Sequence, residues 1–147
     1  MTGNYGIYGI IDQMLFSSPY GKKKSDSQPQ EGLGFFHRLA LQPANRNILQ
    51  FYCDTGLTYQ GLFPSRHEDL LGIALAYGLL SNDWVEATKQ SQGIAPSRTT
   101  YDLELTYQIQ VTHWLTIQPD LQYLIHPGTT QTYPNAFVLG LRSSIVF

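Results

Sequence analysis

Residues 101–112, YDLELTYQIQVT, alternate between apolar or aromatic side chains and polar ones without an exception. Because successive side chains of a β-strand point to opposite faces, this stretch predicts a strand with one apolar and one hydrophilic face. Such a strand fits two architectures. In a soluble sandwich the apolar face packs into the core, whereas in a membrane barrel it contacts lipid and the polar face lines water. The rest of the sequence has to indicate which of the two faces contacts water, and therefore which architecture the chain adopts.

Six further stretches have strand character, and none of them repeats with a helical period. They are 3–16, 32–42, 48–60, 70–80, 116–126 and 136–147. Turn-forming residues fill the connections, so consecutive strands are expected to be antiparallel neighbours. We therefore predict an all-β chain built as an antiparallel meander of about seven strands. No helix is predicted, although the connection at 84–92 has room for a helical turn.

The connection between the strands at 101–112 and 116–126 is short enough to predict a register. Keeping polar side chains on one face pairs Thr112 with Thr116 across a three-residue loop, and therefore Gln108 with Asp120. Pro119 lies inside the second strand and cannot donate a backbone hydrogen bond. A bulge at this proline would change the predicted register.

The composition favours a wall between lipid and water. Only 14% of the residues are charged, although 42% are hydrophobic and ten are tyrosines, and soluble domains usually carry about a quarter charged residues. The net charge of −2 gives no basic surface for nucleic acid. One cysteine makes no internal disulfide, and the four histidines lack metal-ligand spacing, so neither a metal site nor a cofactor site is predicted.

The distribution of side chains between the two faces points the same way. On the strands between residues 70 and 147, the apolar faces carry no Asp, Glu, Lys or Arg, as a lipid-facing surface requires. Between its two end residues, the opposite face of 70–80 carries only glycine and alanine, and the neighbouring strands carry mainly Gln and Thr on that face. Aromatic residues gather at the predicted strand ends, as in the two girdles of a membrane barrel; they are Tyr59, Phe63, Tyr101, Trp114, Phe137 and Phe147.

Particular motifs narrow this prediction to a family. The final strand, which ends on phenylalanine, resembles the terminal signature of bacterial outer-membrane barrels. Segments 54–81, 107–128 and 135–147 resemble the carbohydrate-selective porin family (OprB-like), through GLTYQGL followed by a Pro–x–Arg turn, V-T-x-W-L and Q-P-D-L-Q-Y. The resemblance implies a transmembrane β-barrel of about sixteen strands in the outer membrane, through which sugars diffuse passively without a cofactor.

Seven strands are too few to close such a barrel. Residues 1–147 are therefore expected to form the C-terminal part of a single transmembrane β-barrel domain. Residues 1–20 lack the basic leader of a secretory signal peptide, which fits loss of an N-terminal part. The expected partners are outer-membrane lipid, the missing N-terminal barrel strands and weakly, transiently bound sugars. Association into a homotrimer stays open, and no nucleic acid is expected.

Polar side chains near mid-strand on the hydrophilic face are the candidate lining of the channel. Charged and amide groups there could hydrogen-bond sugar hydroxyls weakly, which is what conduction requires. The alternative is that they pair with one another or with water and only hold the wall together. The candidates are Arg38, Asp54, Glu104, Gln108, Gln118, Asp120, Gln122 and Arg142.

Two other functions stay in competition. A soluble β-sandwich acting as a carbohydrate-binding module would need an outer face rich in Lys and Glu, and Greek-key crossings. A barrel hydrolase would need a catalytic constellation. Asp102 and Glu104 are spaced by about 7 Å on one strand face, within the range of glycosidases, but this spacing alone does not indicate catalysis. We predict that the chain is not an enzyme and has no catalytic residue.

Overall fold

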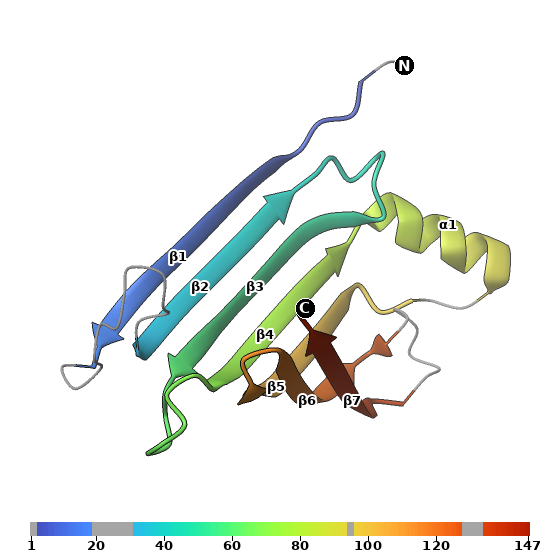
Figure 1. The fold of residues 1–147 in the computed structure, drawn as a ribbon. Coiled ribbons are helices and arrows are strands. Elements are labelled where there is room, and N and C mark those ends of the chain that lie inside the picture. The colour runs from blue at the N-terminus through green and yellow to red at the C-terminus, as the bar shows by residue number, and fades with distance from the viewer. Residues whose placement is uncertain (1–2, 19–30, 94–95, 128–133) are drawn as a thin grey trace.

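The computed structural model describes residues 3–18, 31–93, 96–127 and 134–147. Seven strands form one sheet, and one helix lies in the connection between the fourth and fifth strands (Figure 1). The elements are β1 (Ile7–Ser17), β2 (Gly32–Leu41), β3 (Leu49–Gln60), β4 (Leu70–Leu80), α1 (Asn82–Gln92), β5 (Thr99–Thr112), β6 (Leu115–Ile125) and β7 (Ala136–Ile145).

Every strand is antiparallel to its sequence neighbours, and the strand order in the sheet is the order in the chain. The predicted seven-stranded antiparallel meander is confirmed. The sheet is curved, and the strand direction changes progressively from β1 to β7 (Figure 1). Within the described residues β1 and β7 each pair on one side only, so the sheet is an open segment of wall.

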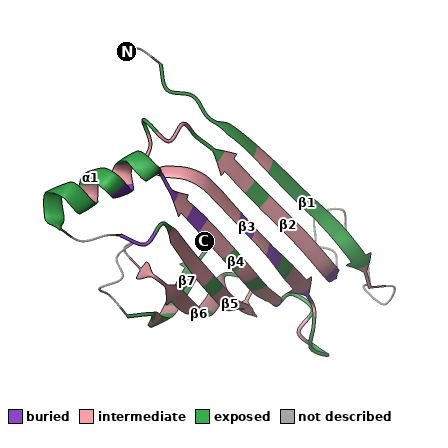
Figure 2. Ribbon diagram, turned by 180° about the vertical axis from the view of Figure 1, so that it is seen from behind, coloured by how far each residue is buried: buried purple, intermediate pink, exposed green. Residues whose placement is uncertain are grey.

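The sheet is a single layer. Three leucines near the middle of their strands on the apolar face, Leu105, Leu121 and Leu139 of the outermost strand β7, are 45%, 38% and 83% exposed. A sandwich would cover these side chains with a second sheet, and the described residues form only one. Figure 2 shows β1 exposed along almost its whole length and α1 beyond the ends of the strands. The soluble-sandwich alternative is therefore wrong for the described residues.

Helix α1 is longer than the single helical turn for which the connection at 84–92 was predicted to have room. It is 11 residues long and begins after Ser81, whose hydroxyl accepts a hydrogen bond from the backbone N–H of Trp84 at 3.1 Å. It ends at Gly93, which has φ of 69° and donates to the carbonyl of Lys89. A serine N-cap and a glycine at the C-terminal end are the usual boundaries of a helix. Within the described ranges, no helix is both long enough and apolar enough to cross a bilayer.

The turn between β5 and β6 is tighter than predicted. Thr112 pairs with Leu115 rather than with Thr116, and Thr116 pairs with Gln110. The extra residue, Val111, lies at a register shift between Gln110 and Thr112. The hydroxyl of Thr112 accepts the backbone N–H of Leu115 at 3.1 Å, which stabilises a two-residue loop. Side-chain capping by threonine and the bulge thus replace the three-residue loop.

This turn moves the register of the two strands by two positions. Asp120 pairs with Thr106, so the predicted pairing of Asp120 with Gln108 is wrong. Because side chains alternate with a period of two, a two-residue shift leaves every side chain on its predicted face. Pro119 causes no bulge, since the same register continues on both sides of it.

Candidate functional site

The eight candidate lining residues lie on one face of the sheet, which we call the polar face. Cross-strand partners share a face of a sheet. Arg38 is paired with Asp54, Glu104 with Gln122, and Gln118 with Arg142. The ladder through β3, β4, β5 and β6 places the remaining candidates on this same face; they are Gln108 and Asp120.

Strand β4 separates the candidates into two groups. Its polar face carries Gly72, Ala74, Ala76 and Gly78, which leave a low strip between larger side chains. On one side lie Arg38 and Asp54 of β2 and β3, and on the other lie the candidates of β5, β6 and β7. The sequence placed all eight on one face, and the predicted strand order together with the glycine and alanine face of 70–80 agrees with this division.

The group on β2 and β3 is a compact hydrogen-bonded cluster. The guanidinium of Arg38 contacts Asp54 twice, with Nη2 2.7 Å from Oδ2 and Nε 2.9 Å from Oδ1. The hydroxyl of Tyr52 donates to Asp54 Oδ2 at 2.9 Å. Asp54 is 6% exposed, whereas the side chain of Arg38 is 54% exposed. A two-point contact of this kind fixes the plane of the guanidinium while leaving its outer edge accessible.

An aromatic ring, that of Phe36, lies between this cluster and the backbone of the sheet. The guanidinium carbon of Arg38 lies 5.2 Å from the centroid of the Phe36 ring, within the range of cation–π contacts. The ring itself lies over Gly56, where an added Cβ would be only 2.5 Å from Phe36 Cε1. Glycine at position 56 therefore makes the room that lets the ring lie against the sheet. Neither Phe36 nor Tyr52 was a candidate from the sequence. Side-chain alternation could have identified both, because it places them on the same face of the sheet as Arg38 and Asp54.

The group on β5, β6 and β7 is predominantly acidic. Its charged candidates are Glu104, Asp120 and Arg142, and Asp102, which is not one of the eight, adds a third carboxylate on the same face. Asp120 lies against Gly140, where any Cβ would collide with the carboxylate. In the described residues, no cluster of three or more His, Cys, Asp or Glu side chains is arranged to hold a metal ion.

The opposite face, which we call the apolar face, has aromatic residues near both strand ends. Near one end, ring centroids are 6.0 Å apart for Phe51 and Tyr77 and 5.1 Å apart for Tyr77 and Tyr101. Near the other, Phe63 and Tyr107 make an edge contact at 5.8 Å. Exposed aliphatic side chains lie between these two sets; they include Ile73, Leu75, Leu103 and Leu105. An apolar band between two aromatic sets matches the cross-section of a bilayer.

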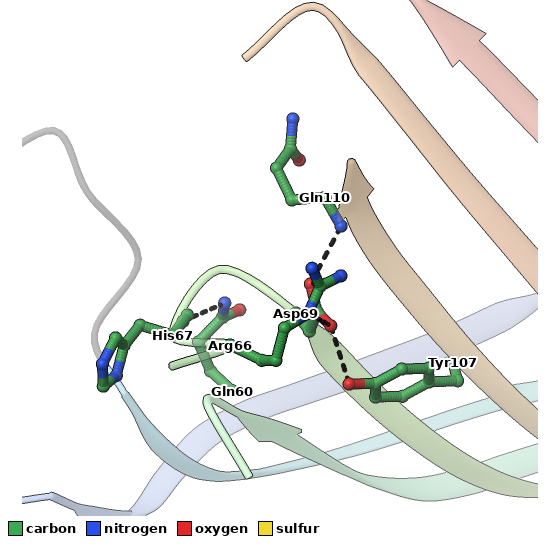
Figure 3. A network of polar contacts seen from close by, with 6 residues as sticks. All are labelled: Gln60, Arg66, His67, Asp69, Tyr107 and Gln110. Carbon is green, nitrogen blue, oxygen red and sulfur yellow. Dashed lines mark hydrogen bonds and ion pairs between the residues drawn. The ribbon is translucent and has the colours of Figure 1, made fainter. Parts of the chain in front are cut away.

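A second polar network lies at the turn between β3 and β4, residues 61–69 (Figure 3). Asp69 is 2% exposed and accepts two contacts from Arg66, at 2.7 and 3.0 Å. It also accepts the hydroxyl of Tyr107 at 2.7 Å and the backbone N–H of Gln110 at 2.9 Å. Strand β4 begins at Leu70, which pairs with Gln108, so no residue of β4 lies opposite Gln110. The Asp69 carboxylate therefore accepts the backbone N–H of Gln110 in place of a strand carbonyl.

The same turn also contacts the connection that precedes β2. Gln60 donates its side-chain amide to the carbonyl of His67 at 3.0 Å. The His67 ring nitrogen Nδ1 lies 2.9 Å from Glu31 Oε1. The turn at residues 61–69 thus contacts the end of β3 through Gln60 and the connection before β2 through Glu31. The sequence showed a Pro–x–Arg turn here but not its partners on β5.

The whole chain, residues 1–147, matches the model of the carbohydrate-selective porins, the OprB family. The chain belongs to the OprB family. It is similar to Porin B of Pseudomonas aeruginosa, with 31% identity over an aligned length of 128 residues and coverage of 79% of this chain and 28% of Porin B. The high-pH structure of Pseudomonas putida OprB has the same fold, with a TM-score of 0.81, 28% identity, and coverage of 97% of this chain and 35% of that one.

Membership of the OprB family confirms the predicted resemblance and places the chain in the bacterial outer membrane. The seven-stranded meander is therefore part of a β-barrel that these residues do not close. The chain spans about a third or less of the length of these two relatives, at 28% and 35%.

The Asp69 network predicts a dependence of stability on pH. Burial alone would raise the pKa of the Asp69 carboxyl, but hydrogen bonds from Tyr107, Arg66 and the Gln110 backbone outweigh it and lower the pKa below 3.8. A lowered pKa stabilises the folded state above the ordinary pKa of the carboxyl, and this contribution is lost as pH falls through the folded value. We expect the stability advantage of the wild type over Asp69→Asn to be constant above about pH 5 and to shrink below about pH 4. Urea midpoints measured in lipid at a series of pH values check this, and a pH-independent difference would contradict it.

Proposed function

We propose that this chain forms part of the wall of a water-filled channel through which carbohydrates diffuse passively across the outer membrane. Residues 1–147 are the C-terminal part of a single barrel domain, and the channel acts without a chemical step or a cofactor. One observation carries the proposal. The chain is a curved, single-layered sheet whose apolar face is uncovered from strand to strand and whose other face is polar. Water and lipid have to contact opposite sides of such a sheet.

The polar face is the proposed channel lining. Its residues alternate with the exposed leucines of the apolar face along each central strand, as in a barrel with a hydrated interior. The proposed lining residues are Arg38, Asp54, Glu104, Gln108, Gln118, Asp120, Gln122 and Arg142. Bidentate pairing of Arg38 with Asp54, together with the 54% exposure of the Arg38 side chain, supports a residue that both holds the wall together and faces the solute.

Cysteine labelling tests which face meets water. We would introduce Glu104→Cys or its sequence neighbour Leu105→Cys in a Cys53→Ala background, and record currents in planar bilayers from protein purified as it occurs in the outer membrane. A membrane-impermeant, charged thiol reagent is expected to change the conductance of the Glu104→Cys protein and to leave that of the Leu105→Cys protein unchanged. Reaction at position 105 alone, or the absence of any conductance, would contradict the proposal.

Transport and association are measured on the same preparation. Liposomes containing the protein are expected to swell in isotonic glucose faster than protein-free liposomes, and to exclude a large dextran. Chemical crosslinking in the membrane counts the barrels per particle and tests the homotrimer, which the sequence leaves open. Glucose permeation no faster than in protein-free liposomes would contradict the carbohydrate channel.

A further inference from the structure

We propose that Arg38, Tyr52 and Asp54 form a preorganised subsite for neutral sugars on the polar face at β2 and β3. This inference rests on the proposed function, because it needs the polar face to meet the solute. It goes further in singling out one cluster as a binding site, with the other polar residues acting as a hydrated surface.

The cluster offers donors and an acceptor side by side. A guanidinium has five N–H donors, and Arg38 directs two of its nitrogens, Nε and Nη2, to Asp54. Its side chain is 54% exposed, so the remaining donors are open to solvent. Tyr52 donates its hydroxyl hydrogen to Asp54, which leaves the lone pairs of the Tyr52 oxygen free to accept. One sugar hydroxyl can accept from Arg38 while its neighbour donates to Tyr52, which is the pattern that a vicinal diol fits.

The charge balance selects neutral solutes. The positive charge of Arg38 is compensated by Asp54 at 2.7 Å, so the cluster carries no net charge to attract an anion. The acidic group across β4 adds three carboxylates against one arginine on the same face. Sugar acids and phosphorylated sugars would therefore meet a repulsive surface, whereas a neutral pyranose pays no such cost.

Packing of the Arg38 guanidinium on the Phe36 ring makes the cluster rigid. Phe36 lies over Gly56, and the Arg38 guanidinium lies over Phe36. With its plane fixed by the ring and by both oxygens of Asp54, Arg38 loses little conformational freedom when a sugar binds. Exposed hydrogen bonds without an enclosing pocket bind weakly, and weak binding is compatible with passage through a channel.

Sugar-induced changes in ionic current test the subsite. Wild-type protein from the outer membrane, in planar bilayers, is expected to show a saturable reduction of its open current on titration with glucose. Arg38→Lys keeps the charge but removes the planar fork, and Tyr52→Phe removes the accepting oxygen. Each is expected to raise the half-saturating glucose concentration by about fivefold, the effect of losing one hydrogen bond. Each titration is normalised to the variant's own open current.

Two comparisons make the result decisive. Arg46→Lys, in the exposed connection between β2 and β3, is the matched control and should bind glucose as the wild type does. Glucuronate should reduce the current more weakly than glucose. Wild-type half-saturation in both Arg38→Lys and Tyr52→Phe, or tighter binding of glucuronate, would overturn the subsite while leaving the channel in place. A protein without conductance would instead overturn the proposed function, and the subsite with it.

Discussion

Replacement of Asp69 by alanine is expected to lower the free energy of unfolding by about 2–4 kcal/mol. Asp69 is almost fully buried and accepts four contacts, from Arg66, Tyr107 and the Gln110 backbone. Alanine leaves these donors without an acceptor, and β4, whose last pair with β5 is Leu70 with Gln108, provides no residue opposite Gln110 to replace it. Arg66 is partly exposed and can turn to water, so the loss falls mainly on the other two groups.

Urea unfolding in lipid vesicles, followed by the fluorescence of the two tryptophans, measures this effect. Glu68→Ala is the matched control, because Glu68 is the exposed neighbour of Asp69 in the same turn. Its unfolding free energy should stay within about 0.5 kcal/mol of the wild-type value. Equal midpoints for Asp69→Ala and Glu68→Ala would show that the network adds nothing to stability.

Leu105→Arg is expected to cost about 2–4 kcal/mol when the protein is folded in a bilayer. Leu105 lies in the middle of β5 on the apolar face and is 45% exposed. At such a site in water, a change to arginine would cost no more than about 0.5 kcal/mol. A large penalty at an exposed position is thus a signature of lipid contact rather than of packing.

Thr106→Arg provides the comparison on the opposite face of the same strand. Thr106 pairs with Asp120, so a new arginine there would have water and a carboxylate beside it. We expect its unfolding free energy to stay within about 0.5 kcal/mol of the wild type. If Thr106→Arg cost as much as Leu105→Arg, the assignment of the two faces to water and lipid would have to be abandoned.

Side-chain alternation was enough to predict the strands and their faces. The stretch at 101–112 has one period throughout, and a register error of two residues could not move any of its side chains to the other face. Predicted and observed strand ends differ by at most a few residues; the largest difference is at β1, predicted from residue 3 and observed from Ile7. Helix α1 was missed because its composition is polar, and only Ser81 and Gly93 mark its ends.

Contacts between distant positions could not be predicted from the sequence. Asp69 and Gln110 are separated by 41 positions, and their contact depends on β4 beginning at Leu70, opposite Gln108, while β5 continues to Thr112. The layering of Arg38 on Phe36 and of Phe36 on Gly56 requires the register of β2 against β3. Patterns within one strand carry no information on which residue lies opposite in the next. The candidate residues were therefore on the predicted face, while their side-chain contacts came only from the structure.

The meander has an odd number of strands, so its two outermost strands, β1 and β7, run in the same direction. Copies of this chain joined head to tail would meet through a parallel seam at each junction, unlike every other pair in the sheet. A cylinder in which all neighbours run in opposite directions instead needs an odd number of additional strands. The fold therefore disfavours a ring built from copies of this chain alone. It favours a partner segment whose two outermost strands both run opposite to β1 and β7.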